Sequence, residues 1–428
     1  MSASKVLLFA VSAPSGERLA EQTASFVGEL ESGLVGAPAA AAGSYRRVVV
    51  ADGYLDAARR LRAARPDEVF TATAGPPRPV VLMVSGVGDE YPGMAEGLFR
   101  HLPVFRRELT RCLRVVTPAL GIDLRGVLYP PDGARHAPTL GELFDQKADT
   151  QEIHRTMVAQ PLAFVTRYAL ARTLVAMGVT PSALLGYSVG EFVCACLTGV
   201  FALEDALRVI AARARLVDAL PEGAMLAVAS GPEPLETHLV EEGVHVAALD
   251  GPELTVLAGP VDAVERVRKR LADHEIAGHR LPTTHAFHSP MMAPIVDPLR
   301  ELLTTVRLSA PSVPFLSNVT GTWIRPEEAA SPDYWASHLC RPIRFADNLA
   351  RLGELDQPIP IEIGPGQTLT NLAVRHIDCR GTALRTLPGV FESRGDLEVL
   401  LTAVGRLWAE GADVDLPPSV LGAHRSGM

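Results

Sequence analysis

The segment G-Y-S-V-G at residues 186–190 carries a side chain that can act as a nucleophile, the hydroxyl of Ser188. It follows a short apolar run, 183–185, and precedes a largely apolar segment, 191–197. This order predicts a strand, a tight turn and a helix, and the flanking glycines would let the turn present the hydroxyl at the top of a sheet. The first amides of such a helix point at the space where an oxyanion forms. The segment therefore predicts a catalytic serine.

A serine hydroxyl needs a base to react at neutral pH. The segment H-A-F-H-S-P-M-M at 285–292 supplies two of the 12 histidines, His285 and His288. It lies where a smaller inserted unit is expected to return to the main fold, over the sheet edge that also carries the serine. No acid is placed as in a serine–histidine–aspartate triad, so we expect a backbone carbonyl to orient the imidazole. At this point either histidine can be the base.

Two further segments could complete the site. The turn S-G-V-G-D-E at 85–90 follows an apolar strand. Its small residues would let backbone amides approach a ligand, and the turn would then form half of an oxyanion hole. The alternative is an ordinary turn between a strand and a helix. Arg213 lies on an expected helix, 205–215, offset from the face that Arg208 and Arg215 share. An inward guanidinium needs an anionic partner because burying an unpaired charge is costly, and its planar fork suits a carboxylate.

The elements that must position these residues alternate along the chain. Apolar strands and helices from residue 80 onward predict an α/β layer fold with a mostly parallel sheet. Residues 223–282 follow the order strand, helix, strand, strand, helix, strand, which is ferredoxin-like. The expected units are a small N-terminal α/β unit (1–78), a three-layer hydrolase-like core (79–222 and 288–385), an inserted ferredoxin-like α+β subdomain (223–287), and a last helix with a polar tail (386–428).

Composition limits the partners. Hydrophobic residues make up 47% of the chain, which indicates a well-packed globular protein. The net charge is −9 with no basic tract, which argues against nucleic acid and anionic membranes as the main binding partners. No apolar run is long enough for a membrane span or a signal peptide. The five cysteines are scattered, which favours a reducing cytoplasm over a disulfide framework or a metal site.

Taken together, the motifs resemble those of malonyl-CoA:acyl-carrier-protein transacylases, of the kind built into modular polyketide synthases as acyltransferase domains. The resemblance covers nearly the whole chain, and several motifs in the right order make it far more specific than any one of them. The family motif P-G-Q-G-x-Q-Y-x-G-M corresponds to 85–94, G-H-S-x-G-E to 186–191 and H-A-F-H to 285–288, and the segments 314–321, 334–335 and 362–366 are also typical.

The resemblance implies a role for each candidate residue. Ser188 would carry the acyl group and His288 would be its base. The backbone amides of Val87 and Val189 would form the oxyanion hole, although Val87 replaces the usual glutamine, and Arg213 would bind the carboxylate of the acyl group. Residues 1–78 would be the linker that follows a ketosynthase, and 386–428 a linker that follows the acyltransferase.

The resemblance also implies substrates and partners. The donor would be an acyl-CoA, with malonyl-CoA favoured, and the acceptor would be the phosphopantetheine thiol of an acyl carrier protein in polyketide biosynthesis. A ketosynthase or the rest of a modular synthase would be a further partner, and no bound cofactor or metal would be needed. Members selective for malonyl groups tend to have H-A-F-H, and Phe287 would fill the space that an α-methyl group needs.

Two departures from the family pattern bear on the acyl group. Tyr187 replaces the usual histidine before the serine, and Asp250 stands where asparagine is common. A carboxylate at that position would put negative charge near a pocket for an anionic acyl group. The expected specificity pocket comprises Gln160, Tyr187, Asp250, His285 and Phe287.

Three other functions stay open. Tyr187 and Asp250 favour a transferase for a different acyl group, including one already on a carrier protein. A serine esterase or thioesterase would share the turn but has no reason to hold Arg213 inward. A non-catalytic module that docks carrier proteins is disfavoured because Ser188, His288 and Arg213 are all intact. The sequence leaves open the pathway, the carrier protein, the oligomeric state and whether the chain acts alone or within a larger synthase.

Overall fold

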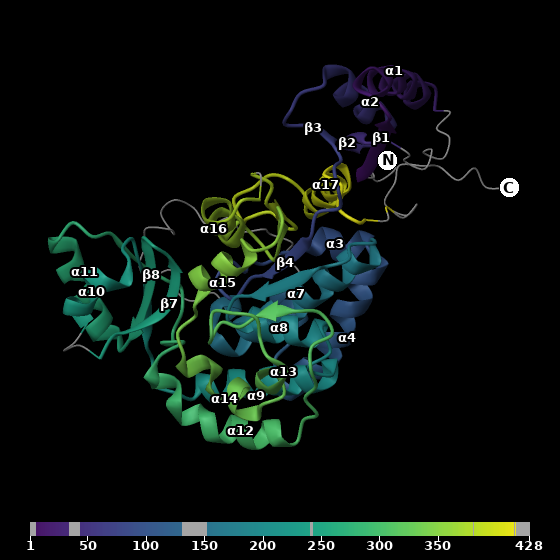
Figure 1. The fold of residues 1–428 in the computed structure, drawn as a ribbon. Helices are drawn as coiled ribbons and strands as arrows, with labels where there is room; N and C mark the ends of the chain where they lie inside the picture. The colour runs from purple at the N-terminus through teal and green to yellow at the C-terminus, as the bar shows by residue number, and fades with distance from the viewer. Residues whose placement is uncertain are drawn as a thin grey trace.

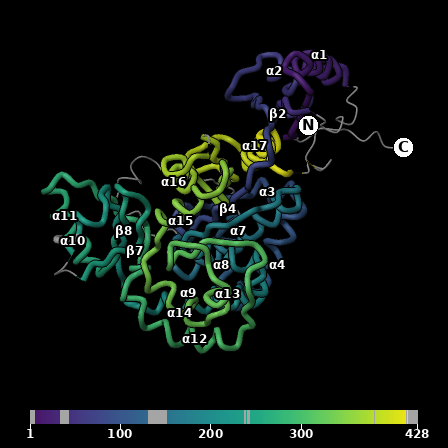
Figure 2. Tube along the Cα trace, in the orientation of Figure 1, coloured from purple at the N-terminus to yellow at the C-terminus, as the bar shows by residue number. Residues whose placement is uncertain are grey.

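The computed structural model describes residues 6–33, 43–130, 152–239, 243–379, 381–414 and 416. These residues form three sheets with helices around them (Figures 1 and 2). A five-stranded sheet lies in the centre, and in the view of Figure 1 the other two sheets lie on opposite sides of it. The tail expected after the last helix lies outside the described residues from position 417 onward.

The central sheet is parallel, and its order is β10-β5-β4-β11-β12. Strands β4 and β11 are buried along their whole length, which is typical of parallel strands covered on both faces. The parallel sheet confirms the α/β fold class predicted from the alternating pattern. The strands are β4 (Val80–Val84), β5 (Ala183–Gly186), β10 (Phe315–Leu316), β11 (Ile359–Ile363) and β12 (Leu384–Arg385).

Alternate residues of β4 face opposite sides of this sheet. Val80, Leu82 and Val84 join one hydrophobic cluster with helices α4, α7, α8 and α9, whereas Val81 and Met83 join a second cluster with α15 and α16. Two helical layers therefore enclose the sheet, as the three-layer prediction requires. These helices are α4 (Pro103–Leu120), α7 (Thr156–Ala176), α8 (Val189–Leu197), α9 (Leu203–Asp218), α15 (Phe345–Leu352) and α16 (Thr368–His376).

Shorter elements complete the core between these layers. Helix α12 packs against α14 and α9. The elements are α3 (Glu96–His101), α5 (Leu124–Leu128), α12 (Val296–Thr304), α13 (Pro326–Ala329) and α14 (Pro332–Ser337), with 3-10 turns at Glu152–His154, Pro290–Ile295 and His338–Cys340.

The inserted unit has the ferredoxin-like order expected from its sequence. Its four strands pair antiparallel in the order β7-β8-β6-β9, with α10 and α11 packed against them. After β9 the chain returns to the core through the segment that carries the H-A-F-H motif. The elements are β6 (Ala224–Val228), α10 (Pro232–Leu239), β7 (His245–Gly251), β8 (Leu254–Gly259), α11 (Val261–Asp273) and β9 (Gly278–Arg280).

The N-terminal unit is joined to the last helix of the chain. Helix α17 packs against β1 and β2, and the guanidinium of Arg46 donates a hydrogen bond of 2.5 Å to the Trp408 carbonyl. A third strand, β3, follows α2 and pairs antiparallel with β2. The elements are β1 (Val6–Ala13), α1 (Gly16–Ser32), β2 (Tyr45–Asp52), α2 (Tyr54–Ala63), β3 (Val69–Thr73) and α17 (Asp396–Ala409), with the strands antiparallel in the order β1-β2-β3.

Two kinds of feature are absent from the described ranges. None of the helices there has the length and apolar character that a bilayer span requires. The same ranges hold no cluster of three or more histidine, cysteine, aspartate or glutamate side chains placed to bind a metal ion.

Candidate active site

Ser188 lies on a strained turn between β5 and α8. Its φ of 53° and ψ of −116° fall in a region that residues other than glycine rarely adopt. Glycine is required on both sides, because a Cβ on Gly186 would lie 2.2 Å from the Glu191 nitrogen and one on Gly190 would lie 2.2 Å from the Val84 carbonyl oxygen. The turn expected from the G-x-S-x-G pattern is therefore present, and it presents a half-buried hydroxyl.

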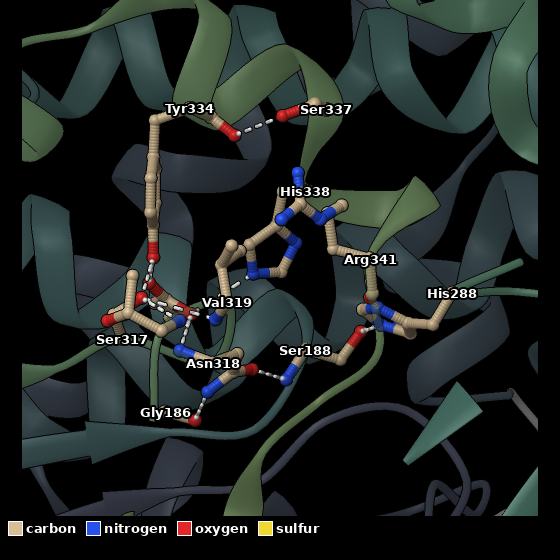
Figure 3. Close-up of polar contacts among 12 residues, drawn as sticks. Gly186, Ser188, His288, Ser317, Asn318, Val319, Tyr334, Ser337, His338 and Arg341 are labelled. Atoms are coloured by element: carbon tan, nitrogen blue, oxygen red, sulfur yellow. Dashed lines mark hydrogen bonds and ion pairs between the residues drawn. The ribbon is translucent and has the colours of Figure 1, made fainter. Parts of the chain in front are cut away.

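The Ser188 hydroxyl contacts His288 (Figure 3). Ser188 Oγ lies 2.8 Å from His288 Nε2, and His288 Nδ1 lies 3.0 Å from the Arg341 carbonyl oxygen. A carbonyl only accepts hydrogen bonds, so Nδ1 carries the proton and Nε2 of the neutral ring accepts from the serine. A backbone carbonyl thus occupies the place that an aspartate has in a triad. His288 also has a positive φ, of 59°, so both members of the pair lie on strained backbone.

The surroundings of His288 favour its neutral form. Burial, followed by the nearby His338, holds the pKa of His288 well below its usual range. The charge of Arg213 lowers this pKa further, and the hydrogen bond to the Arg341 carbonyl opposes the shift. The imidazole is therefore unprotonated and able to accept a proton at neutral pH.

A pH prediction follows from the direction of this shift. Only neutral His288 can take the proton of Ser188, so acylation slows when the pH falls through the pKa of His288. The ordinary pKa of histidine is ~6.5. Because the pKa of His288 is lowered, we expect the acylation rate to stay constant as the pH falls past this value and to decline only at lower pH. Single-turnover acylation measured across the acid range tests this, and an inflection at or above the ordinary value would contradict it.

Two backbone amides are available beside the hydroxyl. Val189 is the first residue of α8, so its N–H has no acceptor within the helix. The loop that carries Val87 passes close to the serine, since a Cβ on Gly86 would lie 3.6 Å from the Ser188 Cβ. Val87 and Val189, the two residues whose amides were predicted to form the oxyanion hole, thus both lie near the nucleophile turn.

A buried ion pair fixes the loop that carries Val87. Arg167 Nη2 donates to Glu90 Oε1 at 2.6 Å and to the Gly86 carbonyl at 3.0 Å, and Glu90 Oε2 accepts from the Gly88 amide at 2.8 Å. Both charged side chains are about 1% exposed or less. Because each of them also bonds the loop backbone, the pair holds the loop in one conformation.

Arg213 points inward from α9, as the helical pattern allowed. It is 1% exposed, and its guanidinium carbon lies 5.0 Å from the centroid of the Phe192 ring. Its Nε and Nη1 have no hydrogen-bond partner among the described residues. Burial lowers the pKa of Arg213 to about 9, so it stays protonated at neutral pH. A buried cation with such free donors can bind an anion.

A cavity lies between the loop after β4 and the start of α7. The amide nitrogen and oxygen of Gln160 have no partner among the described residues, and the side chain is 1% exposed. Phe287 also lines the cavity. The lining residues are Val87, Gly88, Glu90, His154, Thr156, Ala159, Gln160, Pro282, Thr283 and Phe287.

Other members of the expected specificity pocket lie outside this lining. His285 is placed behind it, because its Nδ1 lies 2.9 Å from the hydroxyls of both Thr156 and Thr284. Thr156 is itself a wall residue, so His285 supports the wall without forming it. Burial lowers the pKa of His285, which makes the neutral ring its resting form.

The two departures from the family pattern contact each other. The hydroxyl of Tyr187 donates to Asp250 Oδ2 at 3.2 Å, and the Tyr187 ring meets Phe345 edge-on with centroids 5.3 Å apart. Neither residue lines the cavity around Gln160. Burial raises the pKa of Asp250 to about 7, so its carboxyl is less fully ionised at neutral pH than an exposed aspartate is. The repulsion of an anionic acyl group expected from Asp250 is correspondingly weaker.

Several residues around the nucleophile had no role predicted from the sequence. Glu191, at the first turn of α8, is fully buried and accepts from the Asn318 amide at 2.8 Å and from His338 Nε2 at 3.1 Å. The hydroxyl of Tyr334 donates to its other oxygen. The available signal was a carboxylate inside an apolar helix, which must find donors when it is buried.

The fold and this geometry together define a class of protein. It is an α/β protein with a hydrolase-like core, in which a serine on a strand-to-helix turn contacts a histidine. The family model for the acyl transferase domain matches residues 81–413. The chain belongs to this family, and it is an acyltransferase domain of the polyketide synthase type.

Its relatives are large synthases. The chain is 36% identical over 378 residues to a subunit of the phenolphthiocerol/phthiocerol polyketide synthase of Mycobacterium tuberculosis, and the match covers 85% of this chain and 24% of the relative. It is 32% identical over 372 residues to the spectinabilin polyketide synthase system protein NorB of Streptomyces orinoci, with 85% and 16% covered. The chain thus spans a quarter or less of the length of these relatives.

Solved structures of isolated domains match nearly end to end. The acyl transferase domain of ZmaA superposes with a TM-score of 0.85 at 28% identity, covering 97% of this chain and 96% of that one. The acyl transferase domain of SpnD, in complex with 2-(pent-4-yn-1-yl)malonyl, gives a TM-score of 0.83 at 34% identity, covering 97% and 99%. The fold of the whole described chain, with its three sheets, is therefore that of these domains.

Proposed function

We propose that the protein transfers a malonyl group from coenzyme A to the phosphopantetheine thiol of an acyl carrier protein, through an ester on Ser188. The observation that carries this proposal is the meeting of three groups in one place. Ser188 contacts His288 at 2.8 Å. The Arg213 guanidinium, whose Nε and Nη1 have no partner among the described residues, lies over the Phe192 ring, and that ring contacts His338 beside His288. A nucleophile, a base and an anion site are what the transfer of a dicarboxylic acyl group needs.

In the first half-reaction, His288 Nε2 takes the proton of the Ser188 hydroxyl as its oxygen attacks the thioester carbon. The amides of Val87 and Val189 stabilise the negative oxygen of the tetrahedral intermediate, and losing one such donor typically costs about 10²–10³ in rate. The intermediate collapses, the carbon–sulfur bond breaks, and the protonated His288 returns its proton to the thiolate of coenzyme A. An acyl ester remains on Ser188.

In the second half-reaction, the same histidine activates the thiol of the carrier protein. The thiolate attacks the ester, and Ser188 leaves with the proton that His288 had received. Donor and acceptor bind in turn, so ping-pong kinetics follow. Each step uses side chains and amides of the chain together with the two thiols, and none invokes a metal or a bound cofactor.

Two residues, Arg213 and Phe287, support the choice of malonyl. Arg213 supplies a cation for the distal carboxylate, which an acetyl group lacks. Phe287 lies on the wall of the cavity and narrows the space for a branch on the α-carbon, as the H-A-F-H motif implies. The same residue pattern disfavours a simple esterase, because such an enzyme gains nothing from a buried unpaired arginine.

A different dicarboxylic acyl group is the second candidate. The amide of Gln160 favours it, because it has no partner in the part of the chain that the structure describes. A buried amide without a partner is costly, and a malonyl CH₂ offers nothing for the Gln160 oxygen to accept from. The structure of the SpnD domain holds a substituted malonyl group, so related pockets accept such extensions. Competition among acyl-CoA donors decides between the two candidates.

The decisive experiment is intact mass spectrometry after mixing the protein with malonyl-CoA. We expect one added malonyl group on the protein, no adduct on a Ser188→Ala variant, and loss of the adduct when a carrier protein bearing the phosphopantetheine arm is added. An adduct that disappears rapidly in buffer alone would indicate a hydrolase. The absence of any adduct with every acyl-CoA tried would indicate a docking module.

A further inference from the structure

Asn318 lies directly beside the nucleophile turn, and its side-chain amide bonds to both ends of that turn (Figure 3). Its Oδ1 accepts from the Ser188 N–H at 2.7 Å, and its Nδ2 donates to the Gly186 carbonyl at 2.6 Å. Asn318 is 1% exposed. One carboxamide thus satisfies a donor and an acceptor on either side of Tyr187.

The sheet places Asn318 at this position. Strand β10 pairs in parallel with β5, and Leu316 lies opposite Leu185. Parallel strands bring their carboxyl ends to the same edge, so the residue two places after β10 reaches the turn that follows β5. The pairing brings together residues that are 130 positions apart in the chain.

Asn318 is itself held from the far side of the turn. Its backbone N–H donates to Glu191 Oε2 at 2.8 Å, and Glu191 belongs to the helix that the turn begins. His338 Nε2, at 3.1 Å, and the Tyr334 hydroxyl bond the same carboxylate. Asn318 therefore links the end of β5, the nucleophile and the first turn of α8 in one hydrogen-bonded ring.

The strained backbone of Ser188 needs such a support. With φ at 53° the residue lies outside the broad allowed regions, and the turn would relax unless its surroundings held it. Relaxation would move the hydroxyl relative to His288 Nε2, which lies 2.8 Å from it in this conformation. We propose that Asn318 is a positioning residue for the nucleophile, acting through the backbone of Gly186 and Ser188. This inference rests on the proposed role of Ser188.

The test compares the same substitution at two asparagines, with acylation by malonyl-CoA followed in a single turnover. Asn318→Ala removes both bonds to the turn, and we expect acylation to slow by about 10²-fold with little change in the malonyl-CoA concentration that gives half the maximal rate. Asn371→Ala, the same substitution at an exposed position of α16, is the matched control. We expect its acylation rate within about threefold of wild type.

A conservative variant adds a readout that loss of stability alone would not give. In Asn318→Asp, a protonated carboxyl can still donate to the Gly186 carbonyl and accept from Ser188, whereas an ionised one cannot donate. The buried Glu191 carboxylate close by should raise the pKa of the new carboxyl. We expect the ratio of variant to wild-type acylation rate to rise as the pH falls from about 8 to about 5.

The outcomes separate this inference from the proposed function. Absence of an adduct on the wild-type protein would remove the proposed function and this inference with it. If the wild type is acylated but Asn318→Ala reacts within threefold of it, or no more slowly than Asn371→Ala, the positioning role is wrong and the proposed function stands. A rate ratio for Asn318→Asp that does not change with pH would also contradict the positioning role. This second test can be carried out even if Asn318→Ala fails to fold.

Discussion

Replacing His288 with alanine is expected to slow acylation of Ser188 by about 10⁴–10⁶-fold. The hydroxyl would lose the group that accepts its proton, and no other base contacts it in the described part of the chain. The oxyanion amides and Arg213 would remain, so binding of malonyl-CoA should change little. Single-turnover acylation checks the expected loss of rate. The affinity for malonyl-CoA, measured on Ser188→Ala and His288→Ala, checks that binding changes little.

The matched control is a histidine that lies away from the site. His279 is exposed on β9, and His279→Ala should acylate at the wild-type rate. A loss of less than tenfold in His288→Ala would show that another group deprotonates the serine, and the Ser188–His288 contact would then be structural.

Replacing Arg213 with alanine is expected to lower kcat/KM for malonyl-CoA by about 10²–10³-fold. Hydrogen bonds to charged groups contribute about 1.5–3 kcal/mol each, and 1.36 kcal/mol corresponds to a factor of ten. The kcat/KM for acetyl-CoA, whose acyl group has no carboxylate, should stay the same or rise because the variant no longer buries this cation. Competition between the two donors for Ser188 measures this reversal directly.

Arg215→Ala is the control for charge on the same helix, since Arg215 is exposed away from the buried face. It should preserve the preference for malonyl-CoA. An Arg213→Ala variant that kept the malonyl preference of the wild type would show that the carboxylate binds elsewhere, and the unpaired amide of Gln160 would then be the next group to replace.

Much of the fold could be predicted from the sequence because its signals are local. The continuous apolar run of β4 indicated a buried parallel strand, and the change of order after residue 223 indicated the ferredoxin-like unit. Gly186 and Gly190 indicated the nucleophile turn, since no other residue fits so close to the neighbouring backbone. In each case a few adjacent residues carried the whole signal.

The residues that sequence reasoning missed act through contacts between distant segments. The Arg341 carbonyl orients His288 as any residue's carbonyl could, so side-chain type carried no signal. Asn318 stands in a motif typical of the family, but only the pairing of β10 with β5 shows what it bonds. The packing of α17 on β1 and β2 likewise joins the two ends of the described chain, which no local pattern predicts.

The hydrogen bond between Tyr187 and Asp250 joins the core to the inserted sheet, and this has a consequence for engineering. A chimera that exchanges the four-stranded sheet between related domains would separate the two side chains. The one that remained would lose its hydrogen-bond partner. Converting either position alone to the histidine or asparagine usual in the family would do the same. The two residues should be exchanged together, so a designer's crossover points should keep residues 187 and 250 from the same parent.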